Sequence, residues 1–243
     1  MPTSSLPTSS SPSQRVLRVH RLGEVDYQVA WNLQKKYVEL RKDNLVPDTL
    51  FILSHPPTIT LGRNAGKHSL LFDQETIRQE GLSVIESDRG GDATYHGPGQ
   101  IVAYPILDLR PDLQDIPKFV RTLEKVMLNV MHFYGLKGKR VDGAPGAWLG
   151  NPDRKLGAVG ARISRWITHH GIALNVNTHL AHFNYIIPCG LADKSVSSLQ
   201  NELKKTIDFH QAQTCLIEHF GVLFNRKIEE QILDETVFED LSS

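Results

Sequence analysis

The chain has 243 residues, and its 27 Lys and Arg residues balance 27 Asp and Glu residues, so the formal net charge is zero. A balanced charge argues against a nucleic-acid groove or a membrane surface as partner, because both require an excess of basic residues. No apolar run reaches the roughly 18 residues of a membrane-spanning helix. The two cysteines are too few for a disulfide framework, so the sequence predicts a reducing, cytoplasmic location.

Residues 1–14 are expected to form a disordered tail, followed by a single domain over residues 15–243. Eleven of the first 13 residues are Ser, Thr or Pro, and a segment of that composition has too little apolar surface to fold. It also lacks the basic start and apolar stretch of a secretory signal. A domain of the remaining length buries enough surface to fold without disulfides or a structural metal.

Apolar periodicity predicts the helices and strands in chain order. A helical period predicts helices over residues 24–41, about 119–135 and 207–224, and the acidic end after Lys227 is expected to add a fourth. Strand-like runs occupy residues 50–53, 58–61, 83–86, 100–107, 147–149, 157–163 and 168–176. Clusters of strands separate the helices, which predicts an α+β fold with a mixed or antiparallel sheet flanked by helices.

Glycine is concentrated in the middle of the chain, where 12 of the 18 glycines lie between Gly90 and Gly171. Glycine tolerates positive φ and lets a ligand approach the backbone, so this stretch is expected to form loops around a pocket. For any one glycine, a tight turn is the simpler explanation. His96 falls inside the glycine-rich run, where it either contacts a substrate carbonyl or satisfies a loop carbonyl.

The remaining histidines give little support for a metal site. His179 and His182 have the spacing of one helical turn, and His169 and His170 are adjacent, but no second zinc-type pair lies near them. These histidines are interpreted as surface residues beside loops, and no metal is expected.

The two cysteines lie in different settings. Cys189 stands between Pro188 and Gly190, which indicates a turn, and the pattern alone leaves a reactive thiol and a buried one equally open. Cys215 lies within the apolar stripe of a predicted helix and is interpreted as core. Lys155 begins a strand-like run; such a lysine is ordinarily a solvated charge, unless a thiol lies close enough for the ammonium to lower its pKa.

Several motifs occur in a specific order along the chain. They read HPPTITLGR at 55–63, RGGDATYHGPGQ at 89–100, YPILDL at 104–109, GAPGAW at 143–148, RKLGAVG at 154–160, HGIALN at 170–175 and PCGL at 188–191. Together they resemble the octanoyltransferases of lipoate biosynthesis, the lipoate–protein ligase B family. The resemblance covers roughly residues 16–225, and Ser197 is a slight departure, because threonine is expected there.

The resemblance implies a fold similar to the catalytic domain of biotin and lipoate ligases, and a lipoyl(octanoyl) transferase activity. Such an enzyme moves an octanoyl group from acyl carrier protein to one lysine of a lipoyl domain. The implied acceptors are the lipoyl domains of 2-oxoacid dehydrogenases and the glycine cleavage H protein. No cofactor, nucleic acid or membrane is implied.

The resemblance also assigns roles to individual residues. Cys189 is the implied nucleophile that carries the acyl group as a thioester, and Lys155 activates it. Backbone N–H groups of residues 157–160 are expected to stabilise the oxyanion, and bulk added at Gly171 is expected to narrow the acyl pocket. The residues implied to bind substrate are Arg89, Gly90, Gly91, Asp92, Ala93, Thr94, Tyr95, His96, Ala158, Val159, Gly160, Gly171, Ile172 and Ala173.

Two alternatives stay open beside this interpretation. An ATP-dependent lipoate or biotin protein ligase of the same fold can use a lysine matching Lys155 but does not need a thiol at Cys189. A non-catalytic protein that binds lipoyl domains needs neither residue. The presence of both therefore favours the transferase.

Overall fold

The computed structural model describes residues 14–66, 68–187 and 195–234. Its main element is a mixed sheet with the strand order β14–β1–β2–β6–β12–β9–β8–β7, and β13 pairs with β9 beside that path. The strands of this sheet are β1 (Arg15–Glu24), β2 (Asp48–Ser54), β6 (Gln100–Ile106), β7 (Lys139–Val141), β8 (Ala144–Leu149), β9 (Arg154–Val159), β12 (Ile172–Asn175), β13 (Ser195–Val196) and β14 (Arg226–Glu230).

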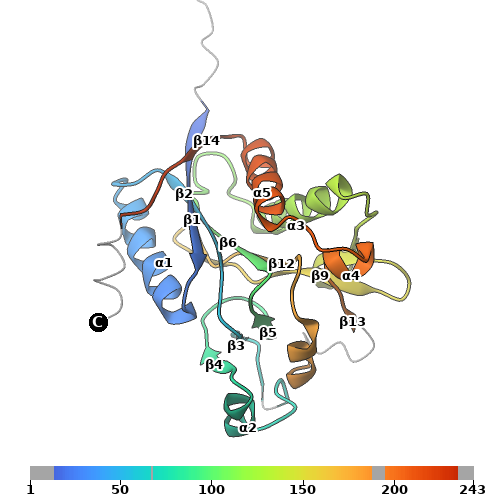
Figure 1. The fold of residues 1–243 in the computed structure, drawn as a ribbon. Helices are drawn as coiled ribbons and strands as arrows, with labels where there is room; N and C mark the ends of the chain where they lie inside the picture. The colour runs from blue at the N-terminus through green and yellow to red at the C-terminus, as the bar shows by residue number, and fades with distance from the viewer. Residues whose placement is uncertain (1–13, 67, 188–194, 235–243) are drawn as a thin grey trace, which may run out of the picture.

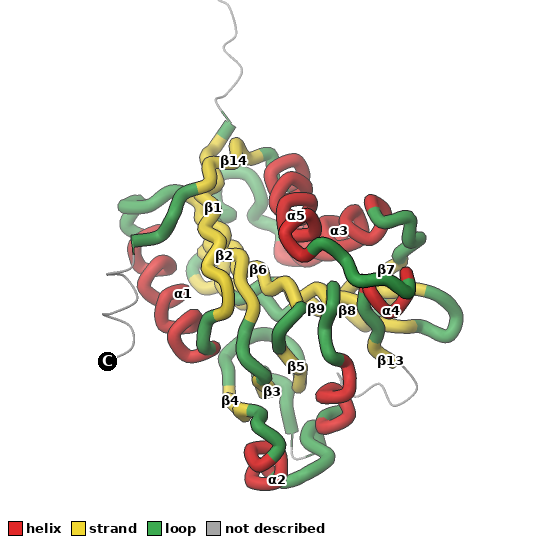
Figure 2. The backbone as a smooth tube through the Cα atoms, viewed as in Figure 1, coloured by secondary structure: helices red, strands yellow, loops and turns green. Residues whose placement is uncertain are grey.

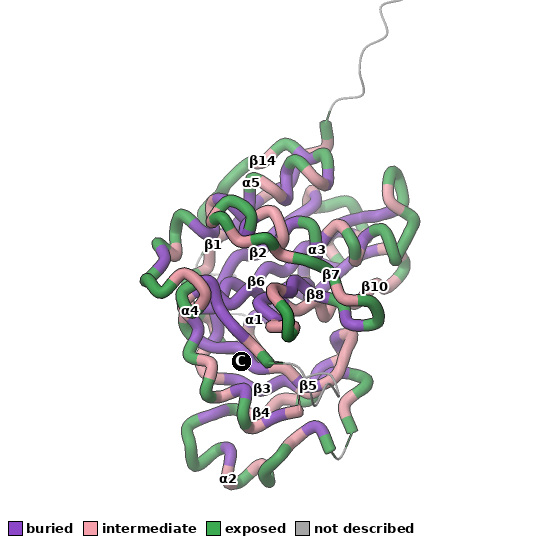
Figure 3. The backbone as a smooth tube through the Cα atoms, turned by 90° about the vertical axis from the view of Figure 1, so that its right-hand side faces the viewer, coloured by how far each residue is buried: buried purple, intermediate pink, exposed green. Residues whose placement is uncertain are grey.

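Helices cover both faces of this sheet (Figures 1 and 2). Helix α1 (Tyr27–Lys42) packs on one face, and α3 (Ile116–Phe133) and α5 (Phe209–Leu223) pack side by side on the other. Every residue of β2 and β6 is therefore buried, and side chains alternate between two cores. Leu50 and Ile52 face the α3–α5 core, whereas Phe51 and Leu53 face α1. Figure 3 shows this burial along the central strands.

A smaller sheet of order β4–β3–β5 lies below the main one in Figure 1. It consists of β3 (Thr58–Leu61), β4 (Ser83–Glu86) and β5 (Ala93–His96). The remaining helices of the described residues are the short α2 (Gln74–Gln79), the short α4 (Leu199–Leu203) and a 3₁₀ helix (Leu180–Tyr185). A two-stranded hairpin joins β10 (Arg162–Ser164) to β11 (Ile167–His169). No helix in the described part of the chain has the length and apolarity to cross a bilayer.

The α+β class and the mixed sheet flanked by helices are confirmed. The prediction of a fourth helix after Lys227 is wrong for residues 228–230, because these residues belong to β14, which pairs in parallel with β1. The β1 strand itself was not anticipated from the sequence. The two strands form together at the sheet edge, and this long-range pairing overrides the local helical preference of the acidic segment. Most of the expected tail, residues 1–13, lies outside the described residues.

Candidate active site

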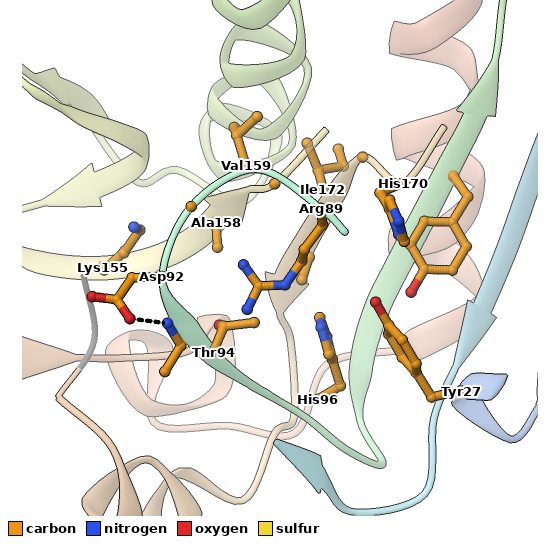
Figure 4. Close-up of a pocket in the computed structure, with 16 residues that line it drawn as sticks. Tyr27, Arg89, Asp92, Thr94, His96, Lys155, Ala158, Val159, His170 and Ile172 are labelled. Carbon is orange, nitrogen blue, oxygen red and sulfur yellow. Dashed lines mark hydrogen bonds between the residues drawn. The ribbon is translucent and has the colours of Figure 1, made fainter. Parts of the chain in front are cut away.

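One cavity gathers most of the predicted site residues (Figure 4). This main cavity encloses about 480 Å³ together with its open mouth. Every residue implied to bind substrate lines it, except Gly90 and Tyr95. Three segments far apart in the sequence contribute: residues 89–96, the β9 strand with Gly160, and residues 170–173.

The β5 strand explains why Tyr95 is excluded. Successive side chains of a strand point to opposite faces, so Thr94 and His96 face the main cavity whereas Tyr95 is fully buried on the other side. There the Tyr95 ring packs edge-on against Phe183, and its hydroxyl hydrogen-bonds with Nδ1 of His182 at 2.9 Å. The expectation that Tyr95 lines the acyl pocket is therefore not met.

Lys155 lies where three cavities meet. Besides the main cavity, it lines an outer cavity that contains Gly90, and a side cavity that contains Asn175. The outer cavity is lined by Asn64, Gly90, Gly91, Asp92, Val120, Gly143, Ala144, Pro145, Lys155, Val159, Gly160 and Ala161. Lys155 is only 9% exposed, and its Nζ lies 5.0 Å from the centre of the Trp148 ring. It is thus not a solvated edge charge.

Three residues to which the sequence assigns no substrate-binding role lie at the cavity end opposite Lys155. Tyr27, Tyr104 and His170 are all buried and line this end together with His96 (Figure 4). Tyr27 had the position of a core residue in a helical stripe, and Tyr104 that of a strand residue. His170 contradicts its interpretation as a surface residue, as does His169, because α1 covers the end of β11. Only the fold brings these side chains together.

Hydrogen bonds fix this end of the cavity. The Tyr27 hydroxyl pairs with Ser87 at 2.9 Å, and the Tyr104 hydroxyl pairs with Nε2 of His55 at 2.8 Å. His96 donates from Nδ1 to Oε1 of Gln100 at 2.8 Å. The Tyr27 and Tyr104 hydroxyls and Nδ1 of His96 therefore each have a hydrogen-bond partner at this end of the cavity.

Asp88 holds His170 in the same way. Nε2 of His170 donates to the Asp88 carboxylate at 2.7 Å, and the His170 N–H donates to Oε1 of Gln34 at 2.6 Å. These contacts support His170 in a left-handed conformation with φ of 51°, which a residue other than glycine rarely adopts.

The same residues form a group of possible metal ligands. Ligand atoms of Asp88, His169 and His170 lie within 4.8 Å of one another, and no second group of this kind occurs among the residues that the structure describes. The guanidinium of Arg162 also contacts the Asp88 carboxylate. Because a cation already occupies that carboxylate, the arrangement is explained as an ion-pair network that orients His170.

Arg89 lines the main cavity, but its guanidinium is engaged by neighbouring oxygen atoms. The guanidinium donates to Oγ1 and O of Thr60 at 2.9 and 2.6 Å and to the Gly90 carbonyl at 3.0 Å. The Asp92 carboxylate likewise accepts from the Ala93 N–H at 2.6 Å. Arg89 and Asp92 therefore shape the loop around the cavity.

The expected oxyanion donors are also engaged. β9 pairs with β8 on one side and with β12 on the other, and a strand paired on both sides uses its N–H groups in the two ladders. The Gly160 N–H donates to the Gly171 carbonyl at 2.8 Å. The Gly160 N–H is therefore not available to an oxyanion, and Ala158, Val159 and Gly160 contribute to the wall of the main cavity.

Cys189 lies outside the described residues, but the described residues on each side of it are placed. The Ile187 N–H donates to the Ser69 carbonyl at 3.0 Å. After the gap, β13 runs parallel to β9, with Val196 opposite Lys155. Cys215 lies in α5 and is 5% exposed, as predicted for a core residue, and burial raises its pKa to about 11.

We predict that acid destabilises the protein through the buried histidines. Burial lowers the pKa of His55 to about 4 and that of His96 well below its usual value. The unfolded chain takes up these protons near pH 6.5, so the stability contributed by neutral His55 is full above that pH and is lost toward pH 4. Between pH 6.5 and 4, His55 should lower the free energy of unfolding by about 1.4 kcal/mol for each pH unit of acidification.

Thermal melts between pH 7 and 4 check this expectation. His55→Gln should flatten part of the pH slope, whereas the same change at exposed His179 should leave the slope unaltered. A melting temperature that stays constant from pH 6.5 to 4.5 would contradict the assigned neutral state.

The chain is similar to known proteins over most of its length. Residues 26–221 match the lipoyl protein ligase A/B catalytic domain model. The octanoyltransferase of Koribacter versatilis is 43% identical over 217 residues, which span 88% of this chain and 86% of the relative. The octanoyltransferase of Desulforamulus reducens is 39% identical over 226 residues, 93% of this chain and 97% of the relative.

Solved structures share the fold at low sequence identity. Lipoate–protein ligase A bound with ATP superposes with a TM-score of 0.75 at 15% identity, covering 93% of this chain and 92% of its own. A bipartite lipoate protein ligase from Thermoplasma acidophilum gives 0.73 at 14% identity, covering 94% and 90%. The expected likeness to lipoate ligases is thereby confirmed for the fold. The matches in sequence go further: the chain belongs to the lipoyl protein ligase A/B catalytic-domain family, and within it to the octanoyltransferases.

Proposed function

We propose that this protein is an octanoyltransferase that carries the acyl group on Cys189. The donor is octanoyl–acyl carrier protein, and the acceptor is one lysine of a lipoyl domain, such as those of 2-oxoacid dehydrogenases and the glycine cleavage H protein. The observation that carries the proposal is the main cavity, a narrow space that begins at Lys155 and ends at a buried wall. Its middle is lined by small and apolar residues, including Ala158, Ile172 and Ala173.

The proposed reaction has two steps that balance chemically. The Cys189 thiolate attacks the carrier thioester, a new thioester forms, and the carrier thiol leaves with a proton. The acceptor amine then attacks acyl-Cys189, an amide forms, and the thiol is regenerated. Exchange between thioesters is nearly balanced in energy, and the amide is more stable than either thioester, so the cycle needs no ATP. The covalent intermediate also divides one encounter of three proteins into two separate dockings.

The cavity charges favour this reaction over an ATP-dependent ligation. A triphosphate needs several unengaged cations or a phosphate-binding loop. Among the described residues of the main and outer cavities, the cations are Arg89 and Lys155, and Arg89 is engaged by Thr60 and Gly90. The ATP-bound structure of similar fold shows that fold alone does not decide between these chemistries.

Intact-mass measurement tests the proposal directly. After incubation with octanoyl–acyl carrier protein and no ATP, one octanoyl group should appear on the protein and disappear when a lipoyl domain is added. An ATP-dependent ligase would give no adduct but would modify the lipoyl domain from free octanoate and ATP. A non-catalytic binder would do neither.

A second prediction concerns acyl-chain length. Ala158 projects into the middle of the main cavity (Figure 4), and Ala158→Leu should exclude two or three methylene groups of the chain. At about 0.8 kcal/mol per methylene, octanoyl transfer should fall roughly 15- to 60-fold, while butyryl transfer stays near the wild-type rate.

The control for this prediction is the same substitution at exposed Ala181, which should change neither rate. An equal loss for all chain lengths would place Ala158 outside the acyl site. Gly171, where added bulk is expected from the sequence to narrow the acyl pocket, is not a suitable position for this test. A Cβ there would lie 2.2 Å from the Ala103 carbonyl oxygen. Substitution at Gly171 would displace β6 instead of narrowing the cavity, although Gly171 does line it.

A further inference from the structure

The Lys155 side chain occupies a slot that exists because residue 146 is glycine. A Cβ at Gly146 would lie 2.8 Å from Cε of Lys155 and 2.4 Å from the Gly157 carbonyl oxygen. Gly146 also has φ of 147°, which residues with a side chain rarely adopt. The path of the Lys155 side chain therefore depends on where the β8 backbone runs at this residue.

An irregularity in the β8–β9 ladder turns Lys155 toward the cavities. Ala147 pairs with Gly157 but Trp148 pairs with Lys155, so β9 has one extra residue, Leu156, at this point. A bulge of this kind places two successive residues on the same side of the sheet and redirects the next one. Leu156 is fully buried in the α3–α5 core, and a Cβ on Gly157 would also meet that core at Met127. Lys155 consequently faces the cavities.

Glu124 of α3 fixes the β8 backbone at the slot. Its Oε1 accepts the Gly146 N–H at 2.9 Å, and its Oε2 accepts from Nε of Arg140 at 2.7 Å. The Glu124 side chain is 7% exposed, whereas Arg140 is 41% exposed and donates also to the Arg121 carbonyl. A buried carboxylate destabilises the folded protein unless both of its oxygens accept hydrogen bonds, as both oxygens of Glu124 do here.

We propose that Glu124 is a positioning residue for Lys155. By holding the Gly146 N–H, it keeps β8 at the distance that leaves the lysine slot open, and it thereby fixes the Nζ of Lys155 at the junction of the three cavities. This inference rests on the proposed role of Lys155 in octanoyl transfer. Glu124 touches no substrate, and its effect on the reaction passes through Gly146.

Truncation at Glu124 tests the inference. Glu124→Ala leaves the Gly146 N–H without its partner and lets β8 relax toward the slot, so kcat should fall at least tenfold with little change in KM. The pH dependence of the transfer step should also shift, because the surroundings of the Lys155 ammonium change. Glu124→Gln should restore kcat to within about threefold, since its amide oxygen still accepts from Gly146 and half-exposed Arg140 can turn to solvent.

Val130→Ala on the same helix is the matched control. Val130 is fully buried in the α3–α5 core and does not line the described cavities. The Val130→Ala variant should lower the melting temperature as much as Glu124→Ala does, without changing kcat or the pH profile of the transfer step. If Glu124→Ala does not fold, Glu124→Asp replaces it, because the shorter side chain keeps the charge but withdraws from Gly146.

The outcomes separate the inference from the proposed function. Wild-type protein that forms no octanoyl adduct would overturn the function itself. Wild type that forms the adduct, together with a Glu124 variant whose kcat and pH profile match those of Val130→Ala, would show that Glu124 only joins α3 to β8 and would overturn the positioning role.

Discussion

Cys189→Ala should eliminate octanoyl transfer and the covalent acyl adduct while leaving the fold intact. Alanine has no group that can form a thioester, so the two-step route is closed, and turnover should fall by at least roughly 10³-fold. Intact mass after incubation with octanoyl–acyl carrier protein measures the adduct, and the same incubation with a lipoyl domain measures turnover.

Cys215→Ala is the control for this variant. Cys215 is a buried residue of α5 whose raised pKa keeps the thiol protonated, so its replacement should leave both the adduct and turnover unchanged. An adduct that survives in the Cys189 variant and is lost in the Cys215 variant would reverse the assignment.

Lys155→Ala should lower turnover by more than about 100-fold. A free thiol with a pKa of about 8.5 is roughly 10% thiolate at pH 7.5, and a neighbouring ammonium that lowers this pKa to about 7 gives about 75%. Thiolate population alone therefore accounts for less than about tenfold. A positioned proton donor or acceptor contributes on the order of 10²–10⁴-fold, and the acceptor amine must lose a proton during transfer.

Lys155→Arg distinguishes these two contributions. Arginine keeps the positive charge and should permit acylation of Cys189, but it does not titrate in this range and cannot accept the proton of the incoming amine. The variant should accumulate acyl-Cys189 and stall before transfer, which a time course of intact mass would detect. Turnover at the wild-type rate would leave Lys155 with the role of a fixed charge. Exposed Lys205→Ala, outside the main cavity, should have no effect in the same assays.

The sequence predicts well those features that depend on short-range pattern or on long motifs. The apolar stripes of α1, α3 and α5 are visible as helical periods, and the motifs at residues 89–100, 154–160 and 170–175 do meet at one cavity. A sequence motif, however, shows only which residues are adjacent in the chain and does not show which way their side chains point. The side-chain directions at Tyr95 and Gly171 could therefore not be predicted. In β5 the Tyr95 side chain points away from the main cavity, and a Cβ at Gly171 would point at the β6 backbone.

Features that arise from pairing over long distances could not be predicted in this way. β14 forms a strand only because β1, more than two hundred residues earlier, offers it a parallel edge. Tyr27 reaches the main cavity from α1, and nothing in the local sequence of this residue indicates that position. Glu124 is a further example, since a single acidic residue in a helix has the appearance of a solvated charge.

On the proposed function, the buried wall of Tyr27, His96, Tyr104 and His170 would set the length of acyl chain that the main cavity accepts (Figure 4). Each of these side chains has a hydrogen bond that would oppose its displacement by an acyl chain longer than octanoyl. The extra methylene groups would then push the other end of the acyl chain outward, and the carbonyl carbon would no longer lie opposite Lys155. Overlong acyl groups would still be held by their apolar length, yet they would be misaligned for reaction, so selectivity would be enforced at the chemical step and not at binding.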